Sequence, residues 1–537
     1  MSKFPIDSVG AAWLADNYEV YPIAHWHVRS QIGTRRITQI VDGKKVEIYP
    51  ESMRPINEPF AHLQFHLRHE ILHLEFLMRL FTKTGSSFIQ AWIDAEPTGQ
   101  YSRRAAFLYE WLTGDLLEPP ARIGGRYVDA IDSASLVTAS PEYVEKVSRW
   151  HINNNLPGTR YFCPMIVKSE AVMQAMSLDI PSLFEDLSNE LGEDLLQRAS
   201  VWMTLRESKA SFAIEGEADR TRRIERFADV MARRTGIDEL PLNEKSLAQL
   251  QQEILGEATM ITHFGLRSSP VFVGETVNFQ EVVHFVAPPA DDVLRMLKGL
   301  HMFFERTQGQ SAVMRSAVVS FGFIYIHPMA DGNGRIHRFL INDVLRRDGA
   351  IHAPIILPIS AVLTADLSER RRYDQVLDEI SKPLMQSVRE YIEFTPMYTT
   401  YADGVVSNFA FSGVEQAYPI WRYPSLDAHI VFLAEIIQRT IRDEMNQQAR
   451  YLRRHARARQ ALKEIVEMPD LQADRVLRSI EQNDGKLSNV LAKEMPILSK
   501  PGIWPELVAA VNSALAEDVS IDRLLISRYG ANRSIDS

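Results

Sequence analysis

Residues 327–338 read HPMADGNGRIHR, and this stretch decides how the chain around it folds. The residues before it, 311–326, are apolar on nearly every side, which is typical of a helix at the centre of a bundle. Pro328 cannot comfortably continue that helix. A second helix is predicted after the glycines, because apolar residues recur at helical spacing from Phe339 to Leu345. The stretch is therefore expected to form a loop between two helices.

This loop has the features of a phosphate site. Gly332, Asn333 and Gly334 provide a backbone with little bulk at the start of a helix, where free N–H groups bind anions. Arg335 and Arg338 are three residues apart, so they share one face of the helix and can hold successive phosphates. The pattern predicts a site for a polyphosphate ligand.

Two further side chains complete a site for phosphate transfer. Asp331 is placed to hold Mg²⁺ against the same phosphates. His327 ends the buried helix and is the expected general base, because imidazole has a pKa near neutral pH. The sequence lacks a Walker A Gly-Lys-Ser/Thr and the set of motifs found in protein kinases. His337 falls between the two arginines and is interpreted as a helix-surface residue without a role.

The stretch resembles the signature of Fic-type protein adenylyltransferases, His-Pro-Phe-x-Asp/Glu-Gly-Asn-Gly-Arg-x-x-Arg. It departs from that signature at Met329, where the family usually has Phe, and Met is a flexible apolar side chain that can fill the same pocket. The resemblance covers the middle third of the chain. It implies a mainly α fold, in which a Fic-type helical bundle carries a small β-hairpin flap between accessory N- and C-terminal regions.

The resemblance also implies an activity, which is transfer of AMP from ATP to a Ser, Thr or Tyr hydroxyl of a target protein. His327 would take the proton of the hydroxyl, and Asp331 would hold Mg²⁺ or Mn²⁺ while pyrophosphate leaves. Asn333 and the amides of Gly332 to Gly334 would stabilise charge on the α-phosphate. Arg335 would hold the β-phosphate and Arg338 the γ-phosphate.

A second segment, residues 211–216, is similar to the family's inhibitory motif, Ser/Thr-x-x-x-Glu-Gly/Asn. Helical spacing precedes it, and Gly216 suits a helix C-cap, so Ser211 and Glu215 are expected on one face of a helix near 195–216. The resemblance implies that Glu215 pairs with Arg338 and turns ATP away from the in-line pose. Taken alone, Glu215 would be a solvated residue at a helix end.

The direction of the reaction stays open. Family members that carry an inhibitory glutamate can also remove AMP, and other members transfer other groups. The sequence does not separate these activities.

A third segment, Val271–Pro289, alternates apolar residues and resembles the flap hairpin of the family. Phe285, Val286 and Ala287 are expected to hold a target segment by adding a strand to the sheet edge. The alternative is an ordinary surface hairpin. A helix is predicted from about Asp291.

Outside these motifs the sequence predicts three regions: a mixed helical N-terminal region at 1–183, a catalytic domain at 184–398 and a helical C-terminal region at 399–537. Strand-like alternation is also seen at Arg36–Tyr49. In the first region, Ser102 is expected to cap a helix that ends at Gly114.

The C-terminal region offers a function of another class. A long helix is predicted to end in five arginines: Arg450, Arg453, Arg454, Arg457 and Arg459. Residues 470–482, the turn at 483–485 and residues 487–493 form a candidate helix-turn-helix or winged helix. The alternative function is a DNA-binding regulator that senses nucleotide. The basic helix also leaves a homodimer open, since a solvated or dimer-facing helix fits the same pattern.

A competing motif lies at 69–73, HEILH, which matches the zinc-protease pattern HExxH. On a helix it would place two imidazoles on one face, which His62 and His66 extend. One zinc-protease class is excluded, because Phe76 and Arg79 stand where that class needs Gly and His. We expect neither a zinc protease nor a dedicated metal site here.

The composition is typical of a soluble folded protein with two or three domains. The chain has 537 residues, 45% apolar and 24% charged, and a net charge of -10, which argues against a chain that coats nucleic acid or membrane. The single cysteine, Cys163, is interpreted as a buried apolar side chain. Met1–Tyr21 lacks the pattern of a secretory signal, and the longest apolar run, Ala317–Ile326, is about half of what a membrane span needs. A cytoplasmic enzyme is expected.

Overall fold

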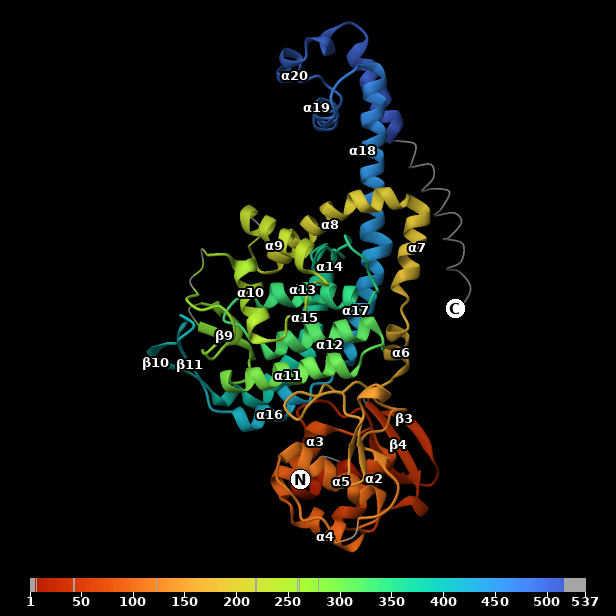
Figure 1. Ribbon diagram of the computed structural model, residues 1–537, viewed down its shortest axis with the longest axis vertical. Helices are drawn as coiled ribbons and strands as arrows, with labels where there is room; N and C mark the ends of the chain where they lie inside the picture. The colour runs from red at the N-terminus through yellow and green to blue at the C-terminus, as the bar shows by residue number, and fades with distance from the viewer. Residues whose placement is uncertain are drawn as a thin grey trace. The chain divides into compact units, whose positions relative to one another are not determined.

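The computed structural model describes residues 5–515 apart from 6, 42–43, 122, 218–219, 258, 260 and 279. The described chain is mainly helical, as predicted (Figure 1). It falls into two compact units, one within Met1–Pro181 and Thr204–Arg439 and the other within Ser182–Met203 and Thr440–Ser537. The three regions expected from the sequence stay a prediction. No helix among the described residues is long and apolar enough to cross a membrane.

The core of the first unit is α12 (Ala312–Ile326), and almost all of its side chains are buried. Ser311 caps the helix, since its hydroxyl accepts a hydrogen bond from the N–H of Met314 at 3.4 Å. Helices α11 (Ala290–Arg306) and α13 (Asn333–Arg347) pack on α12 from either side, and α17 (Asp427–Arg439) also contacts it (Figure 1). The predicted pair of helices with a loop between them is therefore the centre of the unit.

Further helices surround this core: α6 (Glu170–Met176), the part of α8 (Glu193–Ile214) from Thr204 onward, α9 (Thr221–Arg234), α10 (Glu244–Leu255), α14 (Ile359–Leu363), α15 (Leu367–Val388) and α16 (Val414–Arg422). The expected hairpin is present as β8 (Phe272–Val277) and β9 (Gln280–Val286). A second hairpin, β10 (Ile392–Thr400) with β11 (Val406–Phe411), was not predicted. The two hairpins are joined by aromatic contacts, because the Phe272 ring packs on Phe394 and Phe409.

In the N-terminal part of this unit, the described residues form five α-helices and two small sheets. The helices are α1 (Ala11–Tyr18), α2 (Pro59–His69), α3 (Leu74–Thr84), α4 (Ser87–Ala95) and α5 (Gln100–Thr113). One sheet has the order β1 (Ser8–Val9), β2 (Arg29–Gly33), β4 (Lys44–Pro50), β3 (Ile37–Val41), and the other β5 (Val128–Asp129), β7 (Ile152–Asn154), β6 (Glu145–Val147). Cys163 is buried, as predicted.

The predicted cap of α5 is wrong by about a turn. Gly99 is the N-cap, and Ser102 lies inside the helix, where its hydroxyl donates to the carbonyl oxygens of Glu96 and Gly99. A serine hydroxyl that bonds to a preceding carbonyl is a common alternative to capping. The predicted end is confirmed, because Gly114 has the left-handed conformation, with φ 84°.

The HEILH segment does not form one helix face. Helix α2 ends at His69, and His73 caps the next helix by accepting a hydrogen bond from the N–H of Phe76. Glu70 lies between them, where its carboxylate accepts from the N–H of Ala11 at 2.9 Å and pairs with His66 at 2.7 Å. The glutamate therefore fastens the start of α1 to α2. In the described part of the chain, no three acidic, histidine or cysteine side chains gather around a space for a metal.

The second unit includes most of α7 (Ile180–Leu191), a π-helical segment at Thr440–Met445, α18 (Asn446–Ile465), α19 (Asp470–Gln482) and α20 (Asn489–Glu494). The predicted turn after α19 is present, with positive φ at Asp484 and Gly485. Part of the basic charge of α18 is paired, because Arg459 contacts Asp474 at 2.6 Å and Arg450 contacts Glu190. DNA binding and a homodimer stay predictions.

The stability of the first unit is expected to depend on Arg315, which is 1% exposed. Its guanidinium binds Asp348 through two nitrogens at 2.6 and 3.1 Å and donates to the Phe304 carbonyl oxygen. It thereby joins the start of α12 to the ends of α11 and α13. Replacing Arg315 by Met should destabilise the unit by about 3–5 kcal/mol, because it leaves Asp348 without its partner. Calorimetric melting measures this loss.

The matched control is Arg371→Met, since Arg371 is exposed on α15. That change should alter stability by no more than about 0.5 kcal/mol. An equal effect of the two substitutions would contradict the role given to the buried ion pair.

Candidate active site at the end of the central helix

His327 is the C-cap of α12 and has the left-handed conformation, with φ 50° and ψ 58°. Its N–H donates to the Phe323 carbonyl oxygen at 2.9 Å. The ring Nδ1 lies 3.2 Å from the Ile324 carbonyl oxygen. Because a carbonyl oxygen only accepts, Nδ1 must carry the ring hydrogen. Nε2 then keeps its lone pair and is the atom that can take a proton.

The surroundings of His327 favour the neutral ring. Burial, together with the nearby charge of Arg267, lowers the pKa of His327 from 6.5 to about 4. At neutral pH the ring is therefore uncharged, with its single N–H hydrogen on Nδ1. This is the state that a general base needs.

The loop after His327 is held together by Asn333. The side-chain amide of Asn333 accepts from the Met329 N–H at 3.0 Å and donates to the Met329 carbonyl oxygen at 2.7 Å. Met329 is fully buried, as expected of a residue that fills an apolar pocket. Gly332 has φ 91° and is the N-cap of α13. Since the Asn333 side chain is bonded to Met329, a phosphate at this loop would be bound by the main-chain N–H groups.

A single carboxylate bridges the two arginines of α13. Glu215 approaches Arg338 Nη2 with Oε1 at 2.5 Å and forms an ion pair with Arg335 Nε through Oε2 at 3.0 Å. Both guanidinium groups are buried. Arg338 also donates to Ser211, from Nε to the hydroxyl at 2.6 Å and from Nη2 to the carbonyl oxygen at 3.2 Å. The sequence pointed to Arg338 as the partner of Glu215, and the structure adds Arg335.

Gly334 leaves the room that this carboxylate occupies. A Cβ atom at position 334 would lie 2.6 Å from Oε1 of Glu215 and 3.2 Å from Nη1 of Arg338. Such a distance is below any ordinary contact, so a side chain at this position would push Glu215 away. The glycine is needed here for space.

Glu215 reaches the arginines because of how α8 ends. Gly216 has φ 75°. The N–H of Glu217 donates to the Phe212 carbonyl oxygen at 2.8 Å, and that of Gly216 donates to Ala213 at 3.1 Å. This pair of bonds is the Schellman ending of a helix. It fixes the backbone of Glu215 and directs the acid toward α13, although a negative charge is unfavourable at a helix C-terminus.

The same face of α8 carries a third polar contact that the sequence did not indicate. Glu207 lies one helical turn before Ser211 and is fully buried. Its carboxylate accepts from the N–H and the hydroxyl of Ser360 at 2.6 and 2.5 Å. Burial raises the pKa of Glu207 to about 7. The polar residues at 207, 211 and 215 thus attach α8 to α13 and α14.

Asp331 has the donor chemistry for a divalent cation bound with nucleotide. Its side chain is 53% exposed, and one oxygen, Oδ1, accepts from the Gly332 N–H at 2.6 Å and from Arg335 at 3.1 Å. Mg²⁺ is usually held by one or two carboxylates and completed by phosphates and water. One exposed carboxylate beside two arginines fits that pattern.

The residues predicted for target binding by the flap are not at its exposed edge. Phe285, Val286 and Ala287 are all buried. The Val286 carbonyl oxygen accepts from the Trp421 ring at 3.1 Å, and the Ala287 N–H donates to Val271 at 3.1 Å. These main-chain groups are therefore engaged inside the protein. Any added strand must use the exposed part of β8 and β9 instead.

His337 corrects another prediction, because it is 1% exposed and lies in the core rather than on the helix surface. Its Nδ1 binds the Ser320 carbonyl oxygen at 2.8 Å, and its ring packs on Phe321. Burial lowers the pKa of His337 to about 3. The residue joins α13 to α12 in its neutral form.

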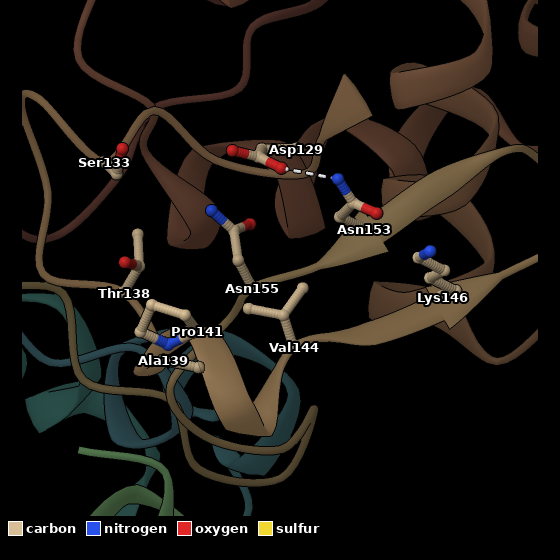
Figure 2. A pocket seen from close by; sticks show the side chains of 9 residues that line it. All are labelled: Asp129, Ser133, Thr138, Ala139, Pro141, Val144, Lys146, Asn153 and Asn155. Atoms are coloured by element: carbon tan, nitrogen blue, oxygen red, sulfur yellow. Dashed lines mark hydrogen bonds between the residues drawn. The ribbon is translucent and has the colours of Figure 1, made fainter. Parts of the chain in front are cut away.

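A cavity of about 400 Å³ lies elsewhere, in the N-terminal part of the same unit (Figure 2). It is lined by Asp129, Ser133, Thr138, Ala139, Pro141, Val144, Lys146, Asn153 and Asn155. The Asn153 amide donates to Asp129 at 2.8 Å across its upper rim (Figure 2). The lining includes none of the motif residues, so the cavity is not the site at His327.

Comparison with known proteins places this site in a family. Residues 241–345 match the Fic/DOC family, so this part of the chain is a Fic domain; the matched range begins after Glu215. The protein adenylyltransferase Fic of Drosophila grimshawi is 29% identical over 123 residues, 23% of this chain and 23% of that protein. Protein adenylyltransferase fic-1 of Caenorhabditis briggsae is 25% identical over 154 residues, 27% of this chain and 28% of that protein. The matches thus span about a quarter of these relatives.

Among solved structures, a Fic family protein from Desulfovibrio desulfuricans aligns with 55% of this chain and 80% of its own, at 17% identity and a TM-score of 0.36. A Fic domain containing signaling protein from Bacteroides thetaiotaomicron aligns with 52% of this chain and 97% of its own, at 18% identity and a TM-score of 0.33.

The ionisation of His327 gives a direct test of the site. A histidine NMR titration of the free protein should show this ring changing charge near pH 4, because burial disfavours the imidazolium. The pKa of His327 in the folded protein is below the value of about 6.5 in an unfolded chain. As the pH falls from 6.5 toward 4, the unfolded chain takes up a proton that the folded protein does not, so the free energy of unfolding decreases. The variant His327→Gln identifies the signal. Titration near 6.5 would contradict the neutral state assigned to the ring.

Proposed function

We propose that this Fic domain transfers AMP from ATP to a hydroxyl group of a target protein. The observation that supports the proposal is the pairing of a neutral His327, whose Nε2 carries no hydrogen, with an anion site built from the start of α13, Arg335 and Arg338. A base and a polyphosphate site on adjacent ends of two buried helices are what nucleotidyl transfer requires. The names of the curated relatives favour the same activity.

The proposed reaction is a single displacement at the α-phosphorus. The hydroxyl oxygen of the target attacks this phosphorus and forms a new P–O bond. The bond from the α-phosphorus to the bridging oxygen breaks, and pyrophosphate leaves with the electron pair. The proton of the hydroxyl passes to Nε2 of His327. Bound phosphates would raise the pKa of this ring by their negative charge, which makes it a better base when ATP is present.

The phosphates would lie along the first turns of α13. The N–H groups that open the helix favour an anion, and we assign the α-phosphate to them. Arg335 and Arg338 would then hold the β- and γ-phosphates through their paired N–H groups. When bound, Mg²⁺ or Mn²⁺ would neutralise charge on the leaving pyrophosphate, and Asp331 is the residue that would hold it.

Glu215 is proposed to inhibit this reaction. Its carboxylate binds Nη2 of Arg338, which the γ-phosphate would need, at 2.5 Å. A phosphate and a carboxylate cannot share this space, so ATP must either displace Glu215 or bind with its phosphates out of line. Removal of the carboxylate should therefore release activity.

Self-modification tests the transfer without a known target. The variant Glu215→Gly, incubated with ATP and Mg²⁺, should gain mass in AMP-sized steps at a rate at least about 10-fold above the unmodified protein, because Arg338 becomes free to orient ATP. The double variant with His327→Ala should lose the gain. Intact-protein mass spectrometry measures both.

Glu217→Gly is the matched control, since Glu217 pairs with Arg223 rather than with the arginines of α13. It should label no faster than the unmodified protein. If Glu215→Gly stays unlabelled with ATP, transfer of AMP is not the activity of this site. Removal of AMP from a modified protein, with Glu215 orienting water, then becomes the leading alternative.

Ser211 should contribute to the inhibition in a graded way. Its hydroxyl accepts from Arg338 Nε at 2.6 Å, so Ser211→Ala loosens the arginine while Glu215 remains. We expect self-modification at a rate between those of the unmodified protein and Glu215→Gly, measured by the same mass analysis.

Ser208→Ala provides the control on the same helix. Ser208 is buried, and its hydroxyl makes no hydrogen bond within the described chain. This variant should match the unmodified protein. Equal activation by both serine changes would show that α8 is merely destabilised.

A further inference from the structure

Arg267 lies in the segment that leads into the flap, and no sequence motif marks it. It is 3% exposed. Its side chain donates three hydrogen bonds, all to main-chain carbonyl oxygens: Nε to His327 at 2.7 Å, Nη1 to Ser269 at 2.9 Å and Nη2 to Pro288 at 2.5 Å. Its own N–H donates to the Pro328 carbonyl oxygen at 2.9 Å. One residue thus binds both peptides of the His-Pro pair and the end of the flap.

These contacts fall on a backbone that is strained. His327 has φ 50°, a left-handed conformation that costs a residue with a Cβ roughly 1–2 kcal/mol. The residue before a proline is also restricted toward extended conformations. Such a conformation persists only where the surroundings determine it more than once. Arg267 does so, because it binds the carbonyl oxygens of His327 and Pro328, which lie on either side of the proline.

The backbone conformation of His327 decides what its ring can do. In this conformation Nδ1 reaches the Ile324 carbonyl oxygen at 3.2 Å, and the lone pair of Nε2 is left for the substrate. A change in φ at His327 would move the ring and the carbonyl group together relative to α12, and it would break that contact. Among the described residues, the side-chain hydrogen bonds of Arg267 go to main-chain carbonyl oxygens and not to the His327 ring or a phosphate-binding side chain. Apart from its charge, which helps to lower the pKa of His327, Arg267 therefore acts on position.

A second cluster keeps Arg267 in place. Asp403, in the turn between β10 and β11, accepts through one oxygen from the N–H groups of Ser268 and Ser269 at 2.9 Å and from the Ser269 hydroxyl at 2.7 Å. The segment that carries Arg267 is therefore attached to the second hairpin on one side and to the catalytic loop on the other.

We propose that Arg267 is the positioning residue for His327, holding the catalytic peptide in its left-handed conformation and joining it to the base of the flap. The inference rests on the proposed AMP transfer. A lysine at this position keeps a positive charge but cannot donate to the carbonyl groups of Ser269, Pro288 and His327 in the same planar arrangement. Turnover should fall while nucleotide binding stays, because Arg335 and Arg338 are untouched.

The test compares Glu215→Gly with Glu215→Gly/Arg267→Lys. We measure the rate of self-modification at saturating ATP and the Kd for ATP by calorimetry. A misplacement of a catalytic group by about 1 Å can lower a rate by about 100-fold, and a drop of that order is expected. The Kd should change by less than about 3-fold. A rate within about 3-fold of Glu215→Gly, or a parallel loss of ATP binding, would overturn the inference.

Arg346→Lys in the same background is the matched control. The guanidinium of Arg346 also donates to two main-chain carbonyl oxygens, those of Thr235 and Ile355, but at the far end of α13. It should leave the rate within about 3-fold. An equal drop in the Arg346 and Arg267 variants would mean that loss of packing explains both.

An NMR readout keeps the inference separate from the proposed function. If Glu215→Gly shows no labelling at all, the proposed AMP transfer fails. The ¹⁵N shifts of the His327 ring then decide about Arg267. The unmodified protein should show the form with hydrogen on Nδ1, and Arg267→Lys should change it toward a mixture. Unchanged shifts in the lysine variant would overturn the inference.

Discussion

The site is organised by the contact of one carboxylate with two guanidinium groups. Arg335 and Arg338 are buried on the same face of α13, where like charges repel more strongly than they do in water. Glu215 provides one oxygen to each of them. It fits because position 334 has no side chain. A ligand that replaces Glu215 must bring its own negative charge, and a phosphate group does.

The two halves of the site are held by different parts of the chain. The two arginines that would bind phosphate are contacted by α8, through Glu215 and through the bonds of Ser211 with Arg338. The base side is held by Arg267, which binds the peptides around His327 from the segment before the flap. The proposed inhibition and the proposed proton transfer would therefore depend on separate contacts. A substitution in α8 can therefore alter the contacts of the arginines and leave those of His327 unchanged.

Much of this arrangement follows from local patterns. Local sequence predicted three elements in order, which are the buried helix, the glycine loop and the helix after it, because apolar residues recur at helical spacing on both sides of the glycines. A glycine after such a run also predicted that α8 ends at Gly216. Arg267 was not predicted, because its contacts with His327 and Pro288 are to carbonyl groups distant in sequence, which no local pattern indicates. His337 was misplaced because only the packing of α13 on α12 buries it. Glu70 belongs to a segment that matches a zinc-protease pattern, yet its carboxylate binds the start of a helix 59 positions away.

The proposed inhibition by Glu215 would depend on how firmly the Schellman ending closes the last turn of α8. The last turn is closed by two main-chain hydrogen bonds, from Glu217 to Phe212 and from Gly216 to Ala213. Terminal turns open at a small fraction of the free energy of global unfolding. Unwinding this one turn would carry Glu215 away while the buried contact of Glu207 with Ser360 keeps the rest of α8 in place. The basal rate of the proposed reaction would then be set by how often this turn opens, and an activator would need only to bind the opened end of α8.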